Sequence, residues 1–317
     1  MNTIGERFRL TTFGESHGVA VGGVIDGCPS GLKIDYQGIS VDLSRRATGS
    51  TSYSSHRNEV DEVEFLSGLL DDVTLGTPIA FFVRNQDARP EDYEDLKDSY
   101  RPSHADYTYQ QKYGIRDWRG GGRASARTTL PVVVAGAIAK QWLALQGITV
   151  EAIVSHIGGE TDPRRMDALL GQCRHEGDTV GGMAQGFING LPAGLGEPMF
   201  DKFHACLAKA LFSIPAVKGV SFGDGFALTS MRGSQANDLM EVGGDGSVKF
   251  LSNHSGGVQG GITNGEEVCF SVAFKPIPTI GRGDRHDVCA LPRALPIVEA
   301  MAAMVTMDQL LIARTNR

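Results

Sequence analysis

The segment GESHG at residues 14–18 places a serine and a histidine between glycines, where either side chain could do chemistry. It fits the G-x-S-x-G turn of serine hydrolases, in which Ser16 would be the nucleophile. That turn needs a following helix and an oxyanion donor from an earlier loop. Only thirteen residues precede Gly14, and a glycine-rich, strand-like run follows the motif. His17, held on a turn lined by backbone, is therefore the more interesting candidate, as a proton donor.

The segment RDWRGGGRASAR at residues 116–127 is the strongest indication of anion binding. Its glycines leave backbone N–H groups accessible, Ser125 offers a hydroxyl, and the predicted helix that follows directs its positive end at the same place. Four arginines in twelve residues of an acidic protein predict a site for multiply charged anions, with a solvated basic turn as the alternative. The G-x-x-x-x-G-K-[ST] loop is absent, so nucleoside triphosphate hydrolysis is not supported.

Several weaker segments add polar groups. Residues 44–57 combine arginine with small hydroxyl residues, and residues 101–107 place His104 beside an acid and an aromatic residue. Spacing alone favours Asp287 as a surface acid paired with Arg285. Together the later segments form a second set of glycine, amide and cationic groups suited to a flavin, at residues 233–238, 253–262, 275–279 and 285–289.

These residues need a scaffold, and the sequence predicts one that mixes strands with a few long helices. Strands are expected at residues 8–13, 18–26, 78–83, 148–157, 217–222 and 268–274. Helices are expected at residues 125–145, 162–173, 199–213 and 296–312, the last with a core stripe of Met301, Met304 and Met307. The arginine-rich stretch 43–57 is expected to be a loop. The two halves look alike in kind and no linker divides them, which predicts one α+β domain over residues 1–317.

Composition excludes several classes of function. The net charge is −7, from 30 Lys+Arg against 37 Asp+Glu, which argues against binding to nucleic acid or an anionic membrane. The five cysteines are scattered without CxxC pairs, so we expect free thiols, no metal site and a reducing cytoplasm. The N-terminus lacks the pattern of a signal peptide, and the apolar stretch 130–145 is too short to span a membrane. The 41 glycines, about twice the ordinary share, indicate a large site lined by backbone.

In combination, GESHG, RPSHADYTY, RGGGRASAR and RHDVC before a terminal helix resemble the chorismate synthases, in order and approximate spacing over residues 2–311. The resemblance implies a β-α-β sandwich, with long helices between two antiparallel sheets in a pseudo-duplicated plan, and a homotetramer. It implies an anti-1,4 elimination of phosphate from 5-enolpyruvylshikimate 3-phosphate, the last common step toward the aromatic amino acids. The reaction needs reduced FMN although it involves no net redox change. An external flavin reductase drawing on NADPH is the expected source of that cofactor.

The resemblance also implies roles for individual residues. His17 would protonate the departing phosphate, His104 would stabilise the reduced flavin, and Asp287 would assist proton removal. Arg46 and Arg127 would bind the phosphate and carboxylates of the substrate. The expected FMN contacts are Arg123, Ala124, Ser125, Gln235, Ala236, Gly261, Lys275, Pro276, Ile277, Pro278, Thr279 and Arg285.

Some positions depart from the family pattern. Only nine residues separate Lys275 from Arg285, where most members have a longer loop. The departures bear on flavin coverage and turnover, and they leave a non-catalytic flavin- or anion-binding relative as the alternative. Retention of His17, His104 and Asp287 favours the enzyme. The single-residue departures are Thr48 for proline, Ser52 for arginine, Ser103 for glycine, Ala124 for serine and Val288 for proline.

Overall fold

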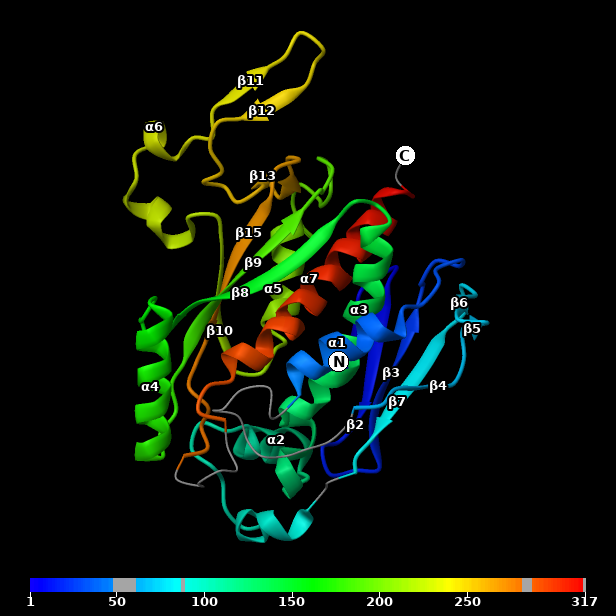
Figure 1. Ribbon diagram of the computed structural model, residues 1–317, viewed down its shortest axis with the longest axis vertical. Helices are drawn as coiled ribbons and strands as arrows, with labels where there is room; N and C mark the ends of the chain where they lie inside the picture. Colours follow the sequence, from blue (N-terminus) through cyan, green and yellow to red (C-terminus); the bar gives the residue numbers. More distant parts are fainter. Residues whose placement is uncertain (48–60, 87–88, 281–286, 316–317) are drawn as a thin grey trace.

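A five-stranded antiparallel sheet forms one side of the computed structural model, which describes residues 1–47, 61–86, 89–280 and 287–315 (Figure 1). In strand β7 the buried residues Ile79, Phe81 and Val83 alternate with more exposed ones, the period expected of a sheet with one covered face. The segment between β2 and β3 carries the GESHG motif, so the sheet fixes where that turn lies. The strand order is β1 (Thr3–Ile4), β2 (Arg9–Gly14), β3 (Ala20–Asp26), β7 (Ile79–Arg84) and β4 (Glu64–Phe65).

A four-stranded antiparallel sheet forms the other side. Strand β15 alternates fully in burial, with Val268, Phe270, Val272 and Phe274 directed to the core. Two of its strands, β10 and β15, have the predicted bounds. The strand order is β10 (Val217–Phe222), β15 (Val268–Phe274), β9 (Gly182–Asn189) and β8 (Thr149–Ile157).

Long helices fill the space between the two sheets (Figure 1). Helices α3 (Leu130–Ala144) and α7 (Leu291–Ala313) pack directly on each other, with α3 against the first sheet and α7 against the second. Their approach is close because Gly136 has no side chain: a Cβ there would lie 2.2 Å from Ala300 Cβ. Helices α1 (Tyr36–Arg46) and α5 (Phe203–Leu211) complete this layer. The predicted β-α-β sandwich is confirmed, and each half supplies an antiparallel sheet and one long helix.

Helix α7 is long and apolar enough to cross a membrane by length and composition alone. Its most apolar window is 83% buried inside the protein, as in the core helix of a globular fold. The stripe of Met301, Met304 and Met307 lies in this core, as predicted. Buried apolar residues of both sheets and of the helices between them belong to one continuous cluster.

The remaining elements lie around this sandwich. Helix α4 (Pro163–Glu176) lies on the outer side of the second sheet, and helix α2 (Asp106–Tyr113) lies below the ends of α1 and α3 in the view of Figure 1. An arm extends from the top of that view and carries α6 (Gly233–Ala236), β11 (Met240–Val242) and β12 (Val248–Phe250). Shorter elements are β5 (Leu69–Leu70), β6 (Val73–Thr74), β13 (Val258–Gln259), β14 (Ile262–Thr263) and the 3₁₀ turns η1 (Pro90–Leu96), η2 (Arg119–Ala124), η3 (Ala126–Thr129) and η4 (Gly225–Ser230).

Two helices differ from the sequence prediction, because α1 was not predicted at all and α7 was predicted to begin later. The stretch from residue 43 was expected to be a loop, but residues up to Arg46 belong to α1. Asp35 caps that helix by accepting a hydrogen bond from the Gly38 N–H, and the buried pair Ile39 and Leu43 has the i, i+4 spacing of a helical face. The helix was missed because it begins upstream of the arginine-rich segment and has only a short apolar face. Helix α7 also begins earlier than predicted, at Leu291, and includes Pro296 within its first turns.

Candidate active site

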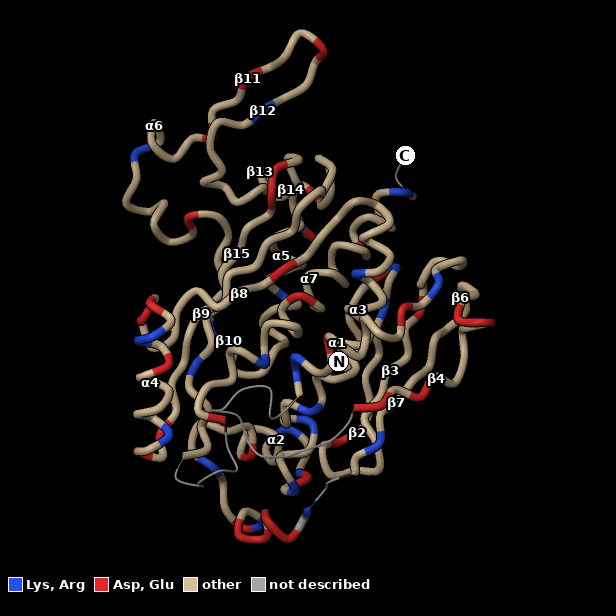
Figure 2. Tube along the Cα trace, viewed as in Figure 1, with Lys and Arg blue, Asp and Glu red and all other residues tan. Residues whose placement is uncertain are grey.

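A cavity of about 2050 Å³ opens at the lower ends of the helices between the sheets. Most of the chemically interesting motifs line it. Among its described lining residues there are ten cationic side chains and five acidic ones, although the protein as a whole is acidic. Figure 2 shows Lys and Arg gathered near the ends of α1 and α3 beside α2. The cations are Arg46, Arg89, Arg101, Arg116, Arg119, Arg123, Arg127, Lys218, Lys275 and Arg293.

His17 lies in the β2–β3 connection and lines this cavity, with only 9% of its surface exposed. The Ser16 hydroxyl lies 2.9 Å from His17 Nδ1 and 3.3 Å from the carbonyl oxygen of Gly120. Tyr93 on η1 meets the imidazole edge-to-face, with ring centroids 5.0 Å apart. Ser16 itself is 1% exposed and is followed by strand β3 instead of a helix. The serine hydrolase alternative therefore lacks the architecture it requires.

The three glycines of RGGGR form the wall behind both candidate histidines. All three have left-handed φ angles, of 58°, 81° and 52° at Gly120, Gly121 and Gly122. A Cβ on Gly120 would lie 2.1 Å from His17 Cε1, and a Cβ on Gly121 would lie 3.1 Å from His104 Cε1. Consecutive glycines thus allow one chain segment to pack against two imidazoles.

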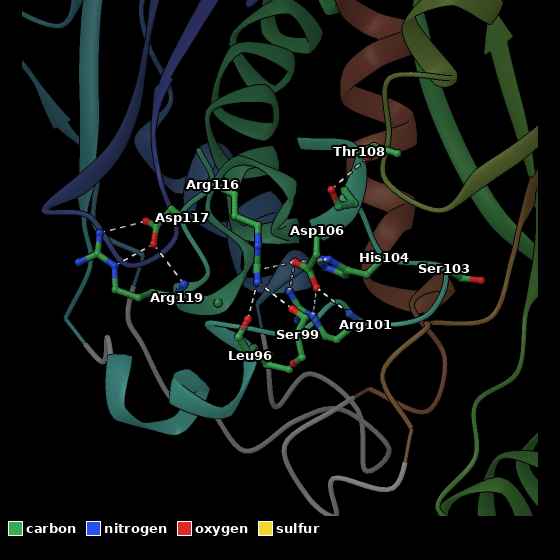
Figure 3. A network of polar contacts seen from close by, with 12 residues as sticks. Leu96, Ser99, Arg101, Ser103, His104, Asp106, Thr108, Arg116, Asp117 and Arg119 are labelled. Atoms are coloured by element: carbon green, nitrogen blue, oxygen red, sulfur yellow. Dashed lines mark hydrogen bonds and ion pairs between the residues drawn. The ribbon is translucent and has the colours of Figure 1, made fainter. Parts of the chain in front are cut away.

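His104 belongs to a network centred on a buried carboxylate, that of Asp106 at the first turn of α2 (Figure 3). His104 Nδ1 lies 2.9 Å from Asp106 Oδ1, an ion-pair distance. Arg101 donates to both carboxylate oxygens, at 2.8 and 2.9 Å, and Arg116 Nη1 lies 3.6 Å from Oδ1. Arg116 also donates to the backbone carbonyls of residues 96, 97 and 99, which ties η1 to this network.

The electrostatics of this network favour a neutral His104 and an ionised Asp106. Burial lowers the pKa of His104 because it disfavours the imidazolium, and the charge of Arg101 lowers that pKa further. Burial alone would raise the pKa of Asp106, but hydrogen bonds from Arg101 outweigh it and bring that pKa to about 2.

Arg46 and Arg127, the predicted substrate ligands, lie at the same carboxylate. Arg46 Nη2 is 2.6 Å from one oxygen of Asp61, and Arg127 Nη1 is 3.0 Å from the other. Each guanidinium is buried, with 5% and 7% of its side chain exposed. Arg127 Nε also donates to Asn85 Oδ1. The structure therefore brings the two arginines together, in a geometry set by Asp61.

Residues expected to bind FMN fall into two groups, and the first lines the cavity. Arg123 donates to the carbonyl of Gly14 and the hydroxyl of Thr12, and Ser125 accepts the Arg127 N–H at the start of η3. Lys275 Nζ donates to the carbonyl of Ser103, beside His104. The lining members are Arg123, Ala124, Ser125, Lys275, Ile277, Pro278 and Thr279.

The second group is not brought to the cavity within one chain. Gln235 and Ala236 lie on α6 of the upper arm, and Gly261 lies between β13 and β14 (Figure 1). Pro276 follows Lys275 but packs near Gly181 and is not among the lining residues. Arg285, like Thr48 and Ser52, lies outside the described residues.

Asp287 lines the cavity at the approach to α7. Its carboxylate pairs with Arg293 of that helix, and Arg293 Nε donates to the carbonyl of Arg46. Asp287 is therefore held by a salt bridge to Arg293, whereas Arg285, the partner that its spacing favoured, lies outside the described residues. The expected surface position was wrong, because Asp287 is only 15% exposed and faces the same cavity as the two histidines.

Sequence analysis missed three residues that hold the others in place. Asp61 bridges two arginines, Asn85 contacts both the His17 turn and Arg127, and Tyr93 packs on His17. None lies in a recognisable motif, because each reaches its partners through the fold. Asp106 was noted as an acid beside His104, without its role as the centre of a network.

Comparison with known proteins agrees with this geometry. A sequence model of the chorismate synthase family matches residues 8–311. The chorismate synthase of Porphyromonas gingivalis is 49% identical, covering 100% of this chain and 97% of that protein, and that of Christiangramia forsetii is 48% identical, covering 100% and 99%. A crystal structure of chorismate synthase superposes with a TM-score of 0.79 at 30% identity, covering 98% of this chain and 93% of the other.

The alignment with the Porphyromonas gingivalis protein runs over 358 positions, against 317 residues in this chain, a difference of 41. The relative thus has additional residues within an otherwise continuous match, and the fold persists without them. A family match over nearly the whole length and relatives that are almost half identical establish that the chain belongs to the chorismate synthase family.

Proposed function

We propose that the cationic cavity is where 5-enolpyruvylshikimate 3-phosphate loses phosphate to give chorismate, with His17, His104 and Asp287 as its acid–base groups. Membership of the chorismate synthase family makes the protein a carbon–oxygen lyase. The observation that carries the assignment of the site is the convergence of two histidines, an acid and a surplus of cations on one cavity. Nothing in the comparisons favours a non-catalytic relative.

The charge of the cavity suits the proposed ligands. A substrate with a phosphate and two carboxylates, beside an anionic flavin, needs concentrated positive charge at a site that excludes water. Arg46 and Arg127 would bind the substrate anions, with Asp61 holding both guanidinium groups before the substrate arrives. Pre-organised donors of this kind need little rearrangement when the substrate binds.

His17 would donate the proton that the leaving phosphate takes up. Ser16 can donate its hydroxyl to the Gly120 carbonyl and accept a hydrogen bond from His17 Nδ1. In that arrangement Nε2 is the atom left to deliver a proton, from the imidazolium form. Burial beside Tyr93 keeps the ring in one orientation.

Reduced FMN is the proposed cofactor, and bound there it would lend an electron transiently to ease cleavage of the carbon–oxygen bond. Arg123, Ser125 and Lys275 would hold it, since they line the cavity next to His104. His104 would face an arriving negative charge, which favours its protonated form against the burial that now lowers its pKa.

Asp287 would assist removal of the hydrogen from carbon 6, while phosphate leaves carbon 3. Arg293 restrains its carboxylate and, through the Arg46 carbonyl, connects it to α1. The remaining proposals are those of the family: a homotetramer in the cytoplasm, supplied with reduced FMN by an external NADPH-dependent reductase. The continuous core supports a single domain over residues 1–317.

The test is an anaerobic assay with chemically reduced FMN and 5-enolpyruvylshikimate 3-phosphate, following phosphate release and chorismate absorbance together. We expect equal amounts of both products, and loss of both in His17→Ala. Tight binding of FMN without either product would refute the proposal. It would indicate that the departures at Ser103 and after Lys275 have removed the activity.

A further inference from the structure

Asn85 lies where the first sheet meets two parts of the candidate active site. It follows β7 directly, and its backbone N–H donates to the carbonyl of Val19 at 3.1 Å. Because β7 pairs with β3, with Arg84 opposite Ala20, this contact continues the sheet by one residue. The position of Asn85 next to the His17 turn is therefore fixed by strand pairing.

The Asn85 side-chain amide has its two N–H groups on the His17 turn. Nδ2 donates to the carbonyl of Glu15 at 3.0 Å and to that of Gly18 at 2.8 Å. These carbonyls flank Ser16 and His17, and the Gly18 N–H closes the same turn by donating to Glu15. The amide thus holds both ends of the loop that presents His17 to the cavity.

The amide oxygen of Asn85 contacts the second part of the site, the guanidinium of Arg127. Oδ1 accepts a hydrogen bond from Arg127 Nε, while Arg127 Nη2 donates to the Arg84 carbonyl at 3.1 Å. The partners settle the orientation of the amide, because carbonyls need a donor and Nε needs an acceptor. Aspartate could serve Arg127 but not the turn, and an apolar side chain could serve neither.

We propose that Asn85 is a positioning residue that fixes the imidazole of His17 relative to the guanidinium of Arg127. The inference rests on the proposed function, in which Arg46 and Arg127 bind the substrate anions and His17 protonates the leaving phosphate. Arg127 is assigned to that phosphate because Asn85 joins it to the His17 turn. Proton transfer needs the donor within hydrogen-bond reach of that phosphate, so the relative placement of the two groups sets the rate. A single amide that contacts both sides provides that placement.

Two substitutions separate the two halves of this role. Asn85→Asp keeps the acceptor for Arg127, loses both donors and directs negative charge at two carbonyl oxygens. Asn85→Leu loses both halves. Gln86→Glu is the matched control, because it adds a charge at the next, exposed residue.

We expect Asn85→Asp to lower kcat by about 30- to 100-fold, since a displacement near 1 Å can cost on the order of 100-fold, with KM within about threefold. Binding of inorganic phosphate, measured by calorimetry without flavin, should stay within about twofold in Asn85→Asp and weaken about tenfold in Asn85→Leu, because only the latter leaves Arg127 without its amide acceptor. Thermal melting and the Gln86→Glu variant separate these effects from general destabilisation.

The proposal is overturned if Asn85→Asp has the kcat of Gln86→Glu, or if it weakens phosphate binding as much as Asn85→Leu does. If the wild-type protein forms no chorismate, the proposed function fails. The positioning of His17 by Asn85 is then tested by NMR of the His17 imidazole in the protein without substrate. A shifted His17 signal in Asn85→Asp, and none in Gln86→Glu, supports the inference, whereas unchanged signals in both refute it.

Discussion

Substitution of Gly120 by alanine tests whether the glycine run positions the histidines. The new Cβ would lie 2.1 Å from His17 Cε1 and 2.2 Å from Nδ1, whereas ordinary contact begins at 3.4 Å. The imidazole would have to move by about 1.3 Å. A displacement of that size at a proton donor can cost on the order of 100-fold in rate. The left-handed backbone at this position, with φ of 58°, would add about 1–2 kcal/mol of strain.

Gly121→Ala is the matched control, because its backbone is also left-handed, with φ of 81°. Its Cβ would lie 3.1 Å from His104 Cε1 and 3.3 Å from Arg101 Nη2, so that shifts of about 0.3 Å relieve the contact. Both variants carry a similar backbone penalty, and their difference isolates the displacement of His17. We expect kcat to fall about 100-fold in Gly120→Ala and less than about tenfold in Gly121→Ala.

The assay is the anaerobic measurement of phosphate and chorismate, with melting temperatures of both variants as a control for folding. Equal losses of kcat in the two variants would show that backbone strain, and not the position of His17, limits the rate. A Gly120→Ala protein with the wild-type kcat would refute the reasoning, because it would mean that His17 need not occupy its observed position.

Three further predictions concern stability and reactivity. The pKa of Asp106 is depressed from 3.8 to about 2, so its contribution to stability is present above about pH 4 and lost between pH 4 and 2. That contribution to the free energy of unfolding is expected to be about 2 kcal/mol. Asp106→Asn should remove this pH dependence from a series of denaturation curves. Ser103 has a left-handed φ of 56°, a conformation that glycine adopts without strain, so Ser103→Gly should raise stability by about 1 kcal/mol in urea melts. No gain would mean that the turn is relaxed with serine. Burial raises the pKa of the Cys28 thiol to about 12 and that of Cys289 to about 11, so both should react with a thiol reagent at pH 8 only after unfolding, and rapid labelling of the native protein would contradict their burial.

The sequence predicted the scaffold well where one period dominates. Strand β15 alternates fully, and its bounds at Val268 and Phe274 were predicted to the residue. Helix α1 was not predicted, because its apolar face is short and its C-terminal end is rich in arginine. Helix α7 was predicted five residues late, because Pro296 resembled a helix start while Pro292, at the second position of the helix, is nearer its true beginning.

The site was predictable to the extent that its chemistry lies in local motifs. His17, His104 and the RGGGR segment line one cavity, as their residue types suggested. The contacts of Asp61 and Asn85 with Arg127 join segments more than forty residues apart, so no local pattern indicates them. The segment of Gln235 and Ala236 was noted for its amide and glycine groups, and the resemblance gave these two residues their role, but a single chain does not bring them to the cavity. Their part in flavin binding stays a prediction.

The pairing of charges in the cavity explains how an acidic protein can bind anions. Several of the cavity arginines are oriented by a carboxylate, as Arg46 and Arg127 are by Asp61 and Arg101 is by Asp106. Such a carboxylate partly neutralises its cluster and reduces the repulsion between neighbouring guanidinium groups. Even with Asp106 added to the five acids that line the cavity, the ten cations among the described lining residues leave a positive surplus that favours bound anions. Removing an orienting acid should therefore disturb the free protein more than the ligand-bound one, because the ligand supplies part of the missing negative charge.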